Sequence, residues 1–149
     1  CEEKTARVPA IGGGNFLLLS KNRASCLAAC EIAVNVMSKL DNVITPFPGG
    51  VVRSGSKVGS KYKALIASTN DAFCPSLKGI TGSKLSKDVS AVMEIVINGL
   101  TKEDIDKAIR ESLIAIAKSK YKKDILSVSA GNYGGKLGQY HFHLRDILK

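Results

Sequence analysis

Apolar positions near the start of the chain predict a strand, a helix and a second strand. Phe16–Leu19 is a short apolar run that follows Gly12–Gly14, which is typical of a buried strand bounded by breaking residues. Val43-Ile44 indicates a second strand, ending at the turn-forming residues 46–50. Between these strands, apolar residues recur at steps of three and four and predict a helix that stops at Asp41-Asn42. The predicted apolar face consists of Leu27, Cys30, Val34, Met37 and Leu40.

The second half of the chain repeats this pattern. Met93–Ile97 reads as a strand, and Thr101 with Asp104 approximates a capping box at the start of a helix. A strand over Ile125–Val128 and a glycine loop at Gly131–Gly135 follow that helix. The apolar face predicted for the helix consists of Ile105, Ile109, Leu113 and Ile116.

Two strand-helix-strand units that share one sheet predict an α+β fold, the ferredoxin-like sandwich, with an antiparallel sheet and both helices on one face. Arg7–Ile11 and Tyr140–Leu144 are candidates for additional edge strands. The connection Val51–Val92 is long, polar and rich in glycine, and connections of that length are usually functional or disordered.

Size and composition indicate a single folded domain, residues 1–149. Apolar residues make up 44% and charged residues 23%, which excludes disordered and fibrous classes. The net charge of +9 favours anionic partners such as nucleic acid, a membrane surface or ligands bearing carboxylates or phosphates. No apolar run approaches the roughly 18 residues of a membrane span. We expect no export signal, and the missing initiator methionine suggests a fragment or a processed chain.

The cysteines favour a reducing, cytoplasmic location. No CxxC pair occurs, and two of the four cysteines fall in the apolar pattern of the first helix, so buried reduced thiols are expected rather than a disulfide or a metal site. The cysteines are Cys1, Cys26, Cys30 and Cys74.

Three features could carry chemistry, and each also has an ordinary explanation. The segment Arg53–Lys61 alternates small residues with cations, so it could bind an anion or form a solvated loop, and it lacks the spacing of a P-loop. Ser68–Asp71 could cap a turn or contact a ligand. Glu94 interrupts an apolar strand, so it either points to solvent or occupies a desolvated site suited to proton transfer.

His141 and His143 alternate along a candidate strand and could share a face, as two metal ligands would. Two ligands do not make a site, and no metal is expected. The glycine loop Gly131–Tyr140 could approach a ligand closely, although tight turns explain its glycines equally well.

Several sequence segments together resemble the C-terminal half of the formylmethanofuran:tetrahydromethanopterin formyltransferases. They occur in the same order as in that family and extend over almost the whole chain. The segments are Gly13–Phe16, Pro46–Gly50, Ser56–Lys61, Ala67–Pro75, Glu94–Leu100 and Ser129–Tyr140. The resemblance implies formyl transfer from methanofuran to a ring nitrogen of tetrahydromethanopterin in methanogenic one-carbon metabolism. It also implies no bound cofactor, a homotetramer, and an active site where lobes and subunits meet. The chain would be the C-terminal ferredoxin-like lobe, and the N-terminal lobe is absent from it.

The resemblance assigns roles to particular residues. Glu94 takes the position of the family's proposed acid/base residue. Both coenzymes carry carboxylates or a phosphate, which the cationic segment would bind. The implied substrate-binding residues are Ser56, Lys57, Ser60, Lys61, Ser68, Thr69 and Asn70. The lysine-rich segment Leu77–Ser90 is not recognised as typical of the family.

Two other functions remain as alternatives. A basic ferredoxin-like domain also describes RNA-binding modules, but aromatic residues total 5%, and the predicted strands Met93–Ile97 and Ile125–Val128 carry none for base stacking. A non-catalytic lobe that serves in structure or oligomerisation is the second alternative, because the other half of the family's length is missing.

Overall fold

The computed structural model describes residues 1–53, 56–58, 67–80, 82–131 and 139–149, without the side chains of residues 56–58 and 67–69. The strands are β1 (Ile11–Ser20), β2 (Val43–Ile44), β3 (Val52–Arg53), β4 (Ser56–Val58), β5 (Ala67–Thr69), β6 (Ala91–Gly99) and β7 (Ile125–Ser129). The α-helices are α1 (Arg23–Met37), α2 (Lys102–Lys118) and α3 (Leu144–Ile147). Short 3₁₀ turns are η1 (Pro48–Gly50), η2 (Asp71–Phe73), η3 (Pro75–Leu77) and η4 (Lys120–Asp124).

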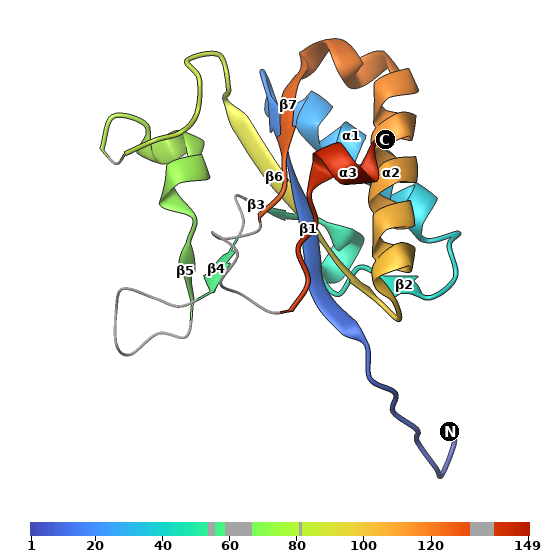
Figure 1. Ribbon diagram of the computed structural model, residues 1–149. Coiled ribbons are helices and arrows are strands. Elements are labelled where there is room, and N and C mark those ends of the chain that lie inside the picture. Colours follow the sequence, from blue (N-terminus) through green and yellow to red (C-terminus); the bar gives the residue numbers. More distant parts are fainter. Residues whose placement is uncertain (54–55, 59–66, 81, 132–138) are drawn as a thin grey trace.

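The main sheet is antiparallel and has the strand order β2-β6-β1-β7, with β3 also paired to β6. The long strands β1 and β6 are central neighbours, and each begins a strand-helix-strand unit (Figure 1). The predicted α+β sandwich of two such units is therefore confirmed, including the antiparallel sheet. The expected strand residues also lie in strands, although β1 and β6 extend beyond the predicted ranges.

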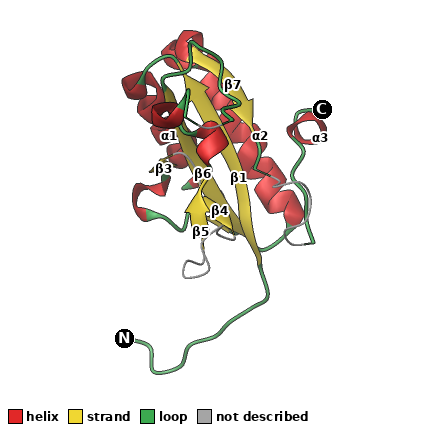
Figure 2. Ribbon diagram, turned by 90° about the vertical axis from the view of Figure 1, so that its left-hand side faces the viewer, coloured by secondary structure: helices red, strands yellow, loops and turns green. Residues whose placement is uncertain are grey.

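Both long helices cover one face of the sheet. Phe16 and Leu18 of β1 and Ile95 and Ile97 of β6 alternate toward α1 and α2 and form the main core with them. The opposite face carries a smaller apolar cluster of Leu17, Leu19, Val89 and Val92. Figure 2 looks toward this second face. Neighbouring residues of these strands therefore point to opposite faces of the sheet and pack in two different clusters.

The predicted apolar face of α1 is wrong in part. Leu27 is 41% exposed, and the helix ends at Met37, before Leu40 and Asp41. The Asn22 side chain caps the helix by accepting a hydrogen bond from the Ser25 amide, which fixes the helix start and its rotation. The buried face is then made largely of small residues, namely Ser25, Cys26, Ala29, Cys30, Ala33 and Met37.

Helix α2 agrees with its prediction. Thr101 and Asp104 form the reciprocal capping box, and all of the predicted apolar face is buried. The small residues of α1 let the two helices approach closely. At their contact, the Ser112 hydroxyl of α2 donates to the Ala33 carbonyl of α1 at 3.3 Å. This packing supports the sheet from the helical side.

Neither candidate edge strand forms. Residues 7–10 are exposed and not in a strand, and β1 begins only at Ile11. At the other end of the chain, Phe142 and Ile147 pack into the main core, and the Arg110 Nε donates to the Ile147 carbonyl at 2.7 Å. Burial of these side chains on α2 favours the short helix α3 over an edge strand.

The segment Leu77–Ser90 covers part of the second face. Val89 is buried there and Leu85 packs against the same cluster. Lys78 donates through its Nζ to the carbonyls of Lys87 and Val89. Its side chain therefore links the start of the segment to its end. Among the described residues, no helix has the length and apolar character needed to cross a membrane.

Candidate active site

Strand alternation places Glu94 on the sheet face opposite the long helices. Val92, two positions earlier on β6, belongs to the apolar cluster of that face, whereas Met93 and Ile95 pack toward the helices. Asn15 lies on the same face because it alternates with Leu17 along β1. In the β1–β6 register Leu17 faces Glu94 and Asn15 faces Val96, so the Asn15 and Glu94 side chains are diagonal neighbours.

Both side chains are buried. Glu94 is 2% exposed and Asn15 is 6% exposed. The sequence left open whether Glu94 points to solvent, and the burial excludes that alternative. Because an isolated carboxylate is costly to bury, the polar contacts of Glu94 decide what state it can adopt.

A short hydrogen-bonded chain links the carboxyl to a third strand. The Asn15 Nδ2 donates to Glu94 Oε1, and the Gly131 backbone amide, just after β7, donates to Asn15 Oδ1 at 2.8 Å. A backbone N–H can only donate, so Oδ1 must face Gly131 and Nδ2 must face Glu94. The orientation of the amide group is therefore determined by its neighbours.

Close packing holds Asn15 in this position. A Cβ atom added to Gly131 would lie 2.6 Å from the Asn15 Nδ2, which is shorter than any normal contact. A Cβ on Gly14, which precedes Asn15, would lie 2.6 Å from the Ile105 Cγ2 of α2. Two glycines thus bring backbone against side chains on both sides of this part of β1.

The predicted binding residues fall partly on a separate two-stranded ribbon. In this ribbon Ser56 is paired with Thr69 and Lys57 with Ser68. The backbone thus brings these four residues together, while their side chains lie outside the described part of the structure. Ser60 and Lys61 also lie outside the described residues. Asn70 follows the ribbon, is partly buried, and accepts a hydrogen bond from the Phe73 amide through its carbonyl at 3.0 Å.

Connectivity limits how far the start of this ribbon can lie from the strand position opposite Glu94. Val52 on β3 is the register partner of Glu94 on β6. Ser56 is four residues further on, and a chain of that length spans at most about 14 Å. The start of the β4–β5 ribbon therefore lies within that distance of the strand position opposite Glu94.

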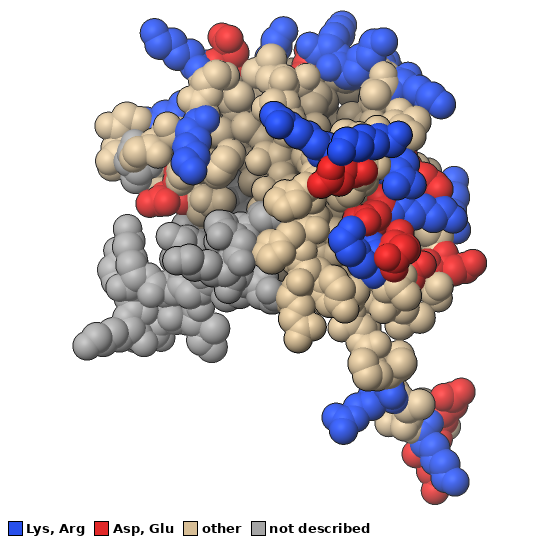
Figure 3. All heavy atoms as spheres, in the orientation of Figure 1, with Lys and Arg blue, Asp and Glu red and all other residues tan. Residues whose placement is uncertain are grey.

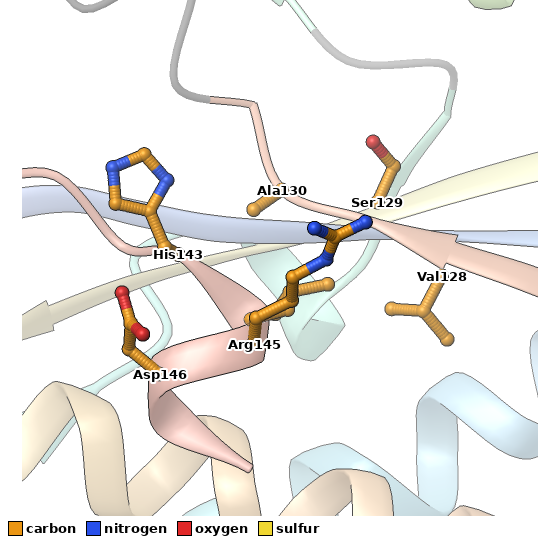
Figure 4. A pocket seen from close by; sticks show the side chains of 7 residues that line it. Val128, Ser129, Ala130, His143, Arg145 and Asp146 are labelled. Carbon is orange, nitrogen blue, oxygen red and sulfur yellow. The ribbon is translucent and has the colours of Figure 1, made fainter. Parts of the chain in front are cut away.

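A second polar feature is an open groove of about 480 Å³ between the end of β7 and α3. Figure 4 shows Arg145 reaching from α3 over the end of β7, with His143 beside it. The groove borders the chain immediately before Gly131. Its lining residues are Val128, Ser129, Ala130, His143, Leu144, Arg145 and Asp146. The sequence pattern missed this groove because residues 140–144 were expected to form a strand.

The two histidines stack on each other, and Cys26 and Cys30 lie on the buried face of α1. The rings of His141 and His143 are stacked with centroids 6.2 Å apart. Within the described ranges, no cluster of three or more histidine, cysteine or acidic residues could hold a metal ion. Cys26 and Cys30 are buried, as expected, whereas Cys1 is exposed and Cys74 is partly buried. A hydrogen bond between the thiols of Cys26 and Cys30 lowers the pKa of Cys26 and, together with burial, raises that of Cys30.

Exposed cations gather at one end of the described surface. Figure 3 shows blue side chains across the top of the molecule, where α2 ends and η4 begins. The exposed lysines of this region are Lys118, Lys120, Lys122 and Lys123.

Comparison with known proteins identifies what this arrangement resembles. Residues 1–147 match the family model described as FTR, proximal lobe. The chain is 62% identical over 147 residues to the formylmethanofuran–tetrahydromethanopterin formyltransferase of Methylobacillus flagellatus, covering 99% of this chain and 49% of that protein.

Two solved structures share the fold. One is the formyltransferase/hydrolase complex of Methylorubrum extorquens with methylofuran, at a TM-score of 0.86 and 48% identity over 94% of this chain and 46% of that chain. The other is the formylmethanofuran:tetrahydromethanopterin formyltransferase of Methanosarcina barkeri, at a TM-score of 0.87 and 44% identity over 94% and 47% of the two chains. The chain thus spans about half the length of the proteins it matches.

Proposed function

The chain belongs to the formylmethanofuran:tetrahydromethanopterin formyltransferase family, and from this premise we propose that it forms the C-terminal lobe of an enzyme that transfers a formyl group between these two coenzymes. Glu94 is the proposed acid/base residue. The observation that carries the proposal is the burial of this carboxyl, at 2% exposure, in hydrogen-bonded contact with Asn15. A carboxyl removed from water can exchange protons with a substrate without competition from bulk solvent.

The reaction needs one group that both accepts and donates a proton. The ring nitrogen of tetrahydromethanopterin attacks the formyl carbon of formylmethanofuran, which forms a C–N bond and a tetrahedral oxyanion. Glu94 removes the proton from the attacking nitrogen and delivers a proton to the methanofuran nitrogen as its C–N bond breaks. The products are the formylated pterin and the free methanofuran amine, and no bound cofactor or metal takes part.

We propose that the ribbon and its connection hold the acidic parts of the coenzymes. The residues are Ser56, Lys57, Ser60, Lys61, Ser68, Thr69 and Asn70, which offer hydroxyl, amide and ammonium groups to carboxylates and phosphate. The methylofuran complex of the M. extorquens relative supports a furan-based donor of this class. The short connection from Val52, opposite Glu94, to Ser56 supports a binding region close to the carboxyl.

The proposed enzyme is cytoplasmic and homotetrameric, and its N-terminal lobe completes the active site. The buried free thiols of Cys26 and Cys30 support a reducing compartment. The matched proteins, about twice as long as this chain, support the need for a second lobe. Activity is therefore expected of the intact enzyme rather than of this chain alone.

Glu94→Gln in the intact enzyme tests the catalytic role. Glutamine keeps an oxygen that can accept from the Asn15 Nδ2 but cannot exchange a proton, so kcat for formyl transfer is expected to fall by about 10²- to 10⁴-fold. Thermal unfolding and subunit assembly are expected to stay near those of the wild type. Glu103→Gln, an exposed carboxyl at the start of α2, is the matched control. Turnover of the Glu94→Gln enzyme at the rate of the control would remove Glu94 from the mechanism and leave this lobe a structural role.

A further inference from the structure

The Asn15 amide contacts one particular oxygen of the Glu94 carboxyl. The backbone amide of Gly131 occupies Oδ1, so Nδ2 is turned toward the carboxyl and donates to Oε1. An oxygen that accepts this N–H bond cannot at the same time present its own O–H in the same direction. A proton on the Glu94 carboxyl is thereby directed to Oε2.

We propose that Asn15 is a positioning residue of the reaction: it holds the Glu94 carboxyl in one orientation, reserves Oε1 as an acceptor, and makes Oε2 the oxygen that gives and takes the proton. This inference rests on the proposed function, since it concerns the residue assigned as acid/base there. Asn15 does not touch the substrate in this scheme. It acts through Glu94, and Gly131 in turn orients Asn15.

The placement of Asn15 suits this task better than a loop residue would. Asn15 lies inside β1, which is paired on both sides, to β6 through Val96 and to β7 from Leu17 onward. The three residues of the hydrogen-bonded chain therefore come from or adjoin three neighbouring strands of one sheet. Rigid elements of this kind hold a reacting group to within a fraction of an ångström, and a misplacement of about 1 Å can cost about 10²-fold in rate.

The alternative is a polar pair that only stabilises the fold. On that view an apolar pair of similar volume would serve as well, because replacing both partners of a buried hydrogen bond is often nearly neutral. The two possibilities differ in what happens to proton exchange when only Asn15 is changed. A purely structural residue alters stability, whereas a positioning residue also alters the pH dependence of turnover.

Asn15→Leu and Asn15→Asp in the intact enzyme separate the two. Leucine removes the donor at similar size, and kcat is expected to fall by about 10²-fold while KM changes by less than about threefold. Loss of a donor to the charged form raises the pKa of the carboxyl, so the acidic limb of the kcat profile shifts to higher pH. Aspartate places a second acceptor against Oε1, which is expected to shift that limb further in the same direction.

Asn98→Leu is the matched control. Asn98 lies on β6 and accepts from the Gly13 amide at 3.0 Å through Oδ1, so it makes the same kind of bond in the same sheet without this contact to Glu94. Its replacement is expected to leave the pH profile unchanged. If Asn15→Leu and Asn15→Asp keep the wild-type limb, or lose no more kcat than Asn98→Leu, the positioning role is wrong.

An infrared measurement keeps this test independent of turnover. The carboxyl stretch of protonated Glu94, identified by its loss in Glu94→Gln, is followed against pH in the unliganded enzyme. Its midpoint is expected to rise in Asn15→Leu, and an unchanged midpoint overturns the inference even if the variant is inactive. If the midpoint rises but the wild-type enzyme transfers no formyl group, the proposed function fails while the control of the Glu94 proton by Asn15 stands.

Discussion

At the scale of single residues, Gly131 joins the backbone after β7 to the buried pair. Its amide donates to the Asn15 Oδ1, and its missing side chain leaves room for the Asn15 amide group. Gly131→Ala is expected to push Asn15 away from Glu94 and to lower kcat by about 10²-fold, close to the effect of Asn15→Leu. Steady-state kinetics of the intact enzyme provides the measurement.

Gly82→Ala is the control for that substitution. A Cβ at Gly82 meets no atom within 4 Å, so the variant adds the same methyl group without crowding. Full activity of Gly131→Ala would mean that the bond to the Gly131 amide does not govern Asn15.

The sequence singled out one residue of the buried pair and left its environment open. Glu94 stood out because a carboxylate inside an apolar strand costs free energy to bury unless it has polar partners or a functional role. Asn15 did not stand out, because an asparagine after three glycines is typical of a turn. Its partners lie 79 and 116 positions away along the chain. Only the strand register brings these residues together, and no local pattern encodes that register.

At the scale of elements, the capping box of α2 is a local device that the sequence predicted correctly. The Thr101 hydroxyl donates to the Asp104 carboxylate at 2.7 Å and accepts from the Asp104 amide at 3.1 Å. Thr101→Ala is expected to lower the free energy of unfolding by about 1 kcal/mol, because the first turn of the helix loses an acceptor. Chemical denaturation monitored by circular dichroism measures this change.

Thr5→Ala, in the exposed segment before β1, is the control and should leave the unfolding free energy unchanged. An equal, negligible effect of both substitutions would show that the capping box contributes nothing to stability.

Helix α1 shows where pattern reasoning fails at this scale. Its buried face is mostly small residues, and a face of alanine, serine and cysteine gives a weak hydrophobic signal. The pattern placed the large apolar residue Leu27 on the buried face, whereas the neighbouring Cys26 is the buried residue. Helix α2 has large aliphatic residues on its buried face, so the same reasoning placed it correctly.

At the scale of the whole molecule, the two faces of the sheet carry different groups. Its helical face holds most of the buried apolar side chains, including Phe142 and Ile147 from the end of the chain. The opposite face carries a smaller apolar cluster, and on it lies the buried pair of Asn15 and Glu94. Because β1 and β6 contribute to both faces, packing against the helices also holds the strands that carry the polar pair.

The same molecule should lose stability in acid through a few identifiable carboxylates. Hydrogen bonds from Thr101, Ser25 and Lys149 hold the pKa values of Asp104, Asp124 and Asp146, respectively, below the ordinary aspartate value. The Ser25 hydroxyl, for example, donates to Asp124 Oδ2 at 2.6 Å. A depressed folded-state pKa means that the unfolded chain takes up protons first as the pH falls.

The stabilising contribution of these groups is therefore complete above the unfolded aspartate pKa of about 3.9 and is lost as the pH falls through the lower folded values. We expect the free energy of unfolding to be level between about pH 5 and 7 and to decline below about pH 4. Denaturant titrations across this range measure the slope. The triple variant Asp104→Asn, Asp124→Asn and Asp146→Asn should show a shallower decline than the wild type. Asp88→Asn, an exposed carboxyl before β6, should not. An unchanged slope in the triple variant would assign acid sensitivity to other carboxylates of the protein.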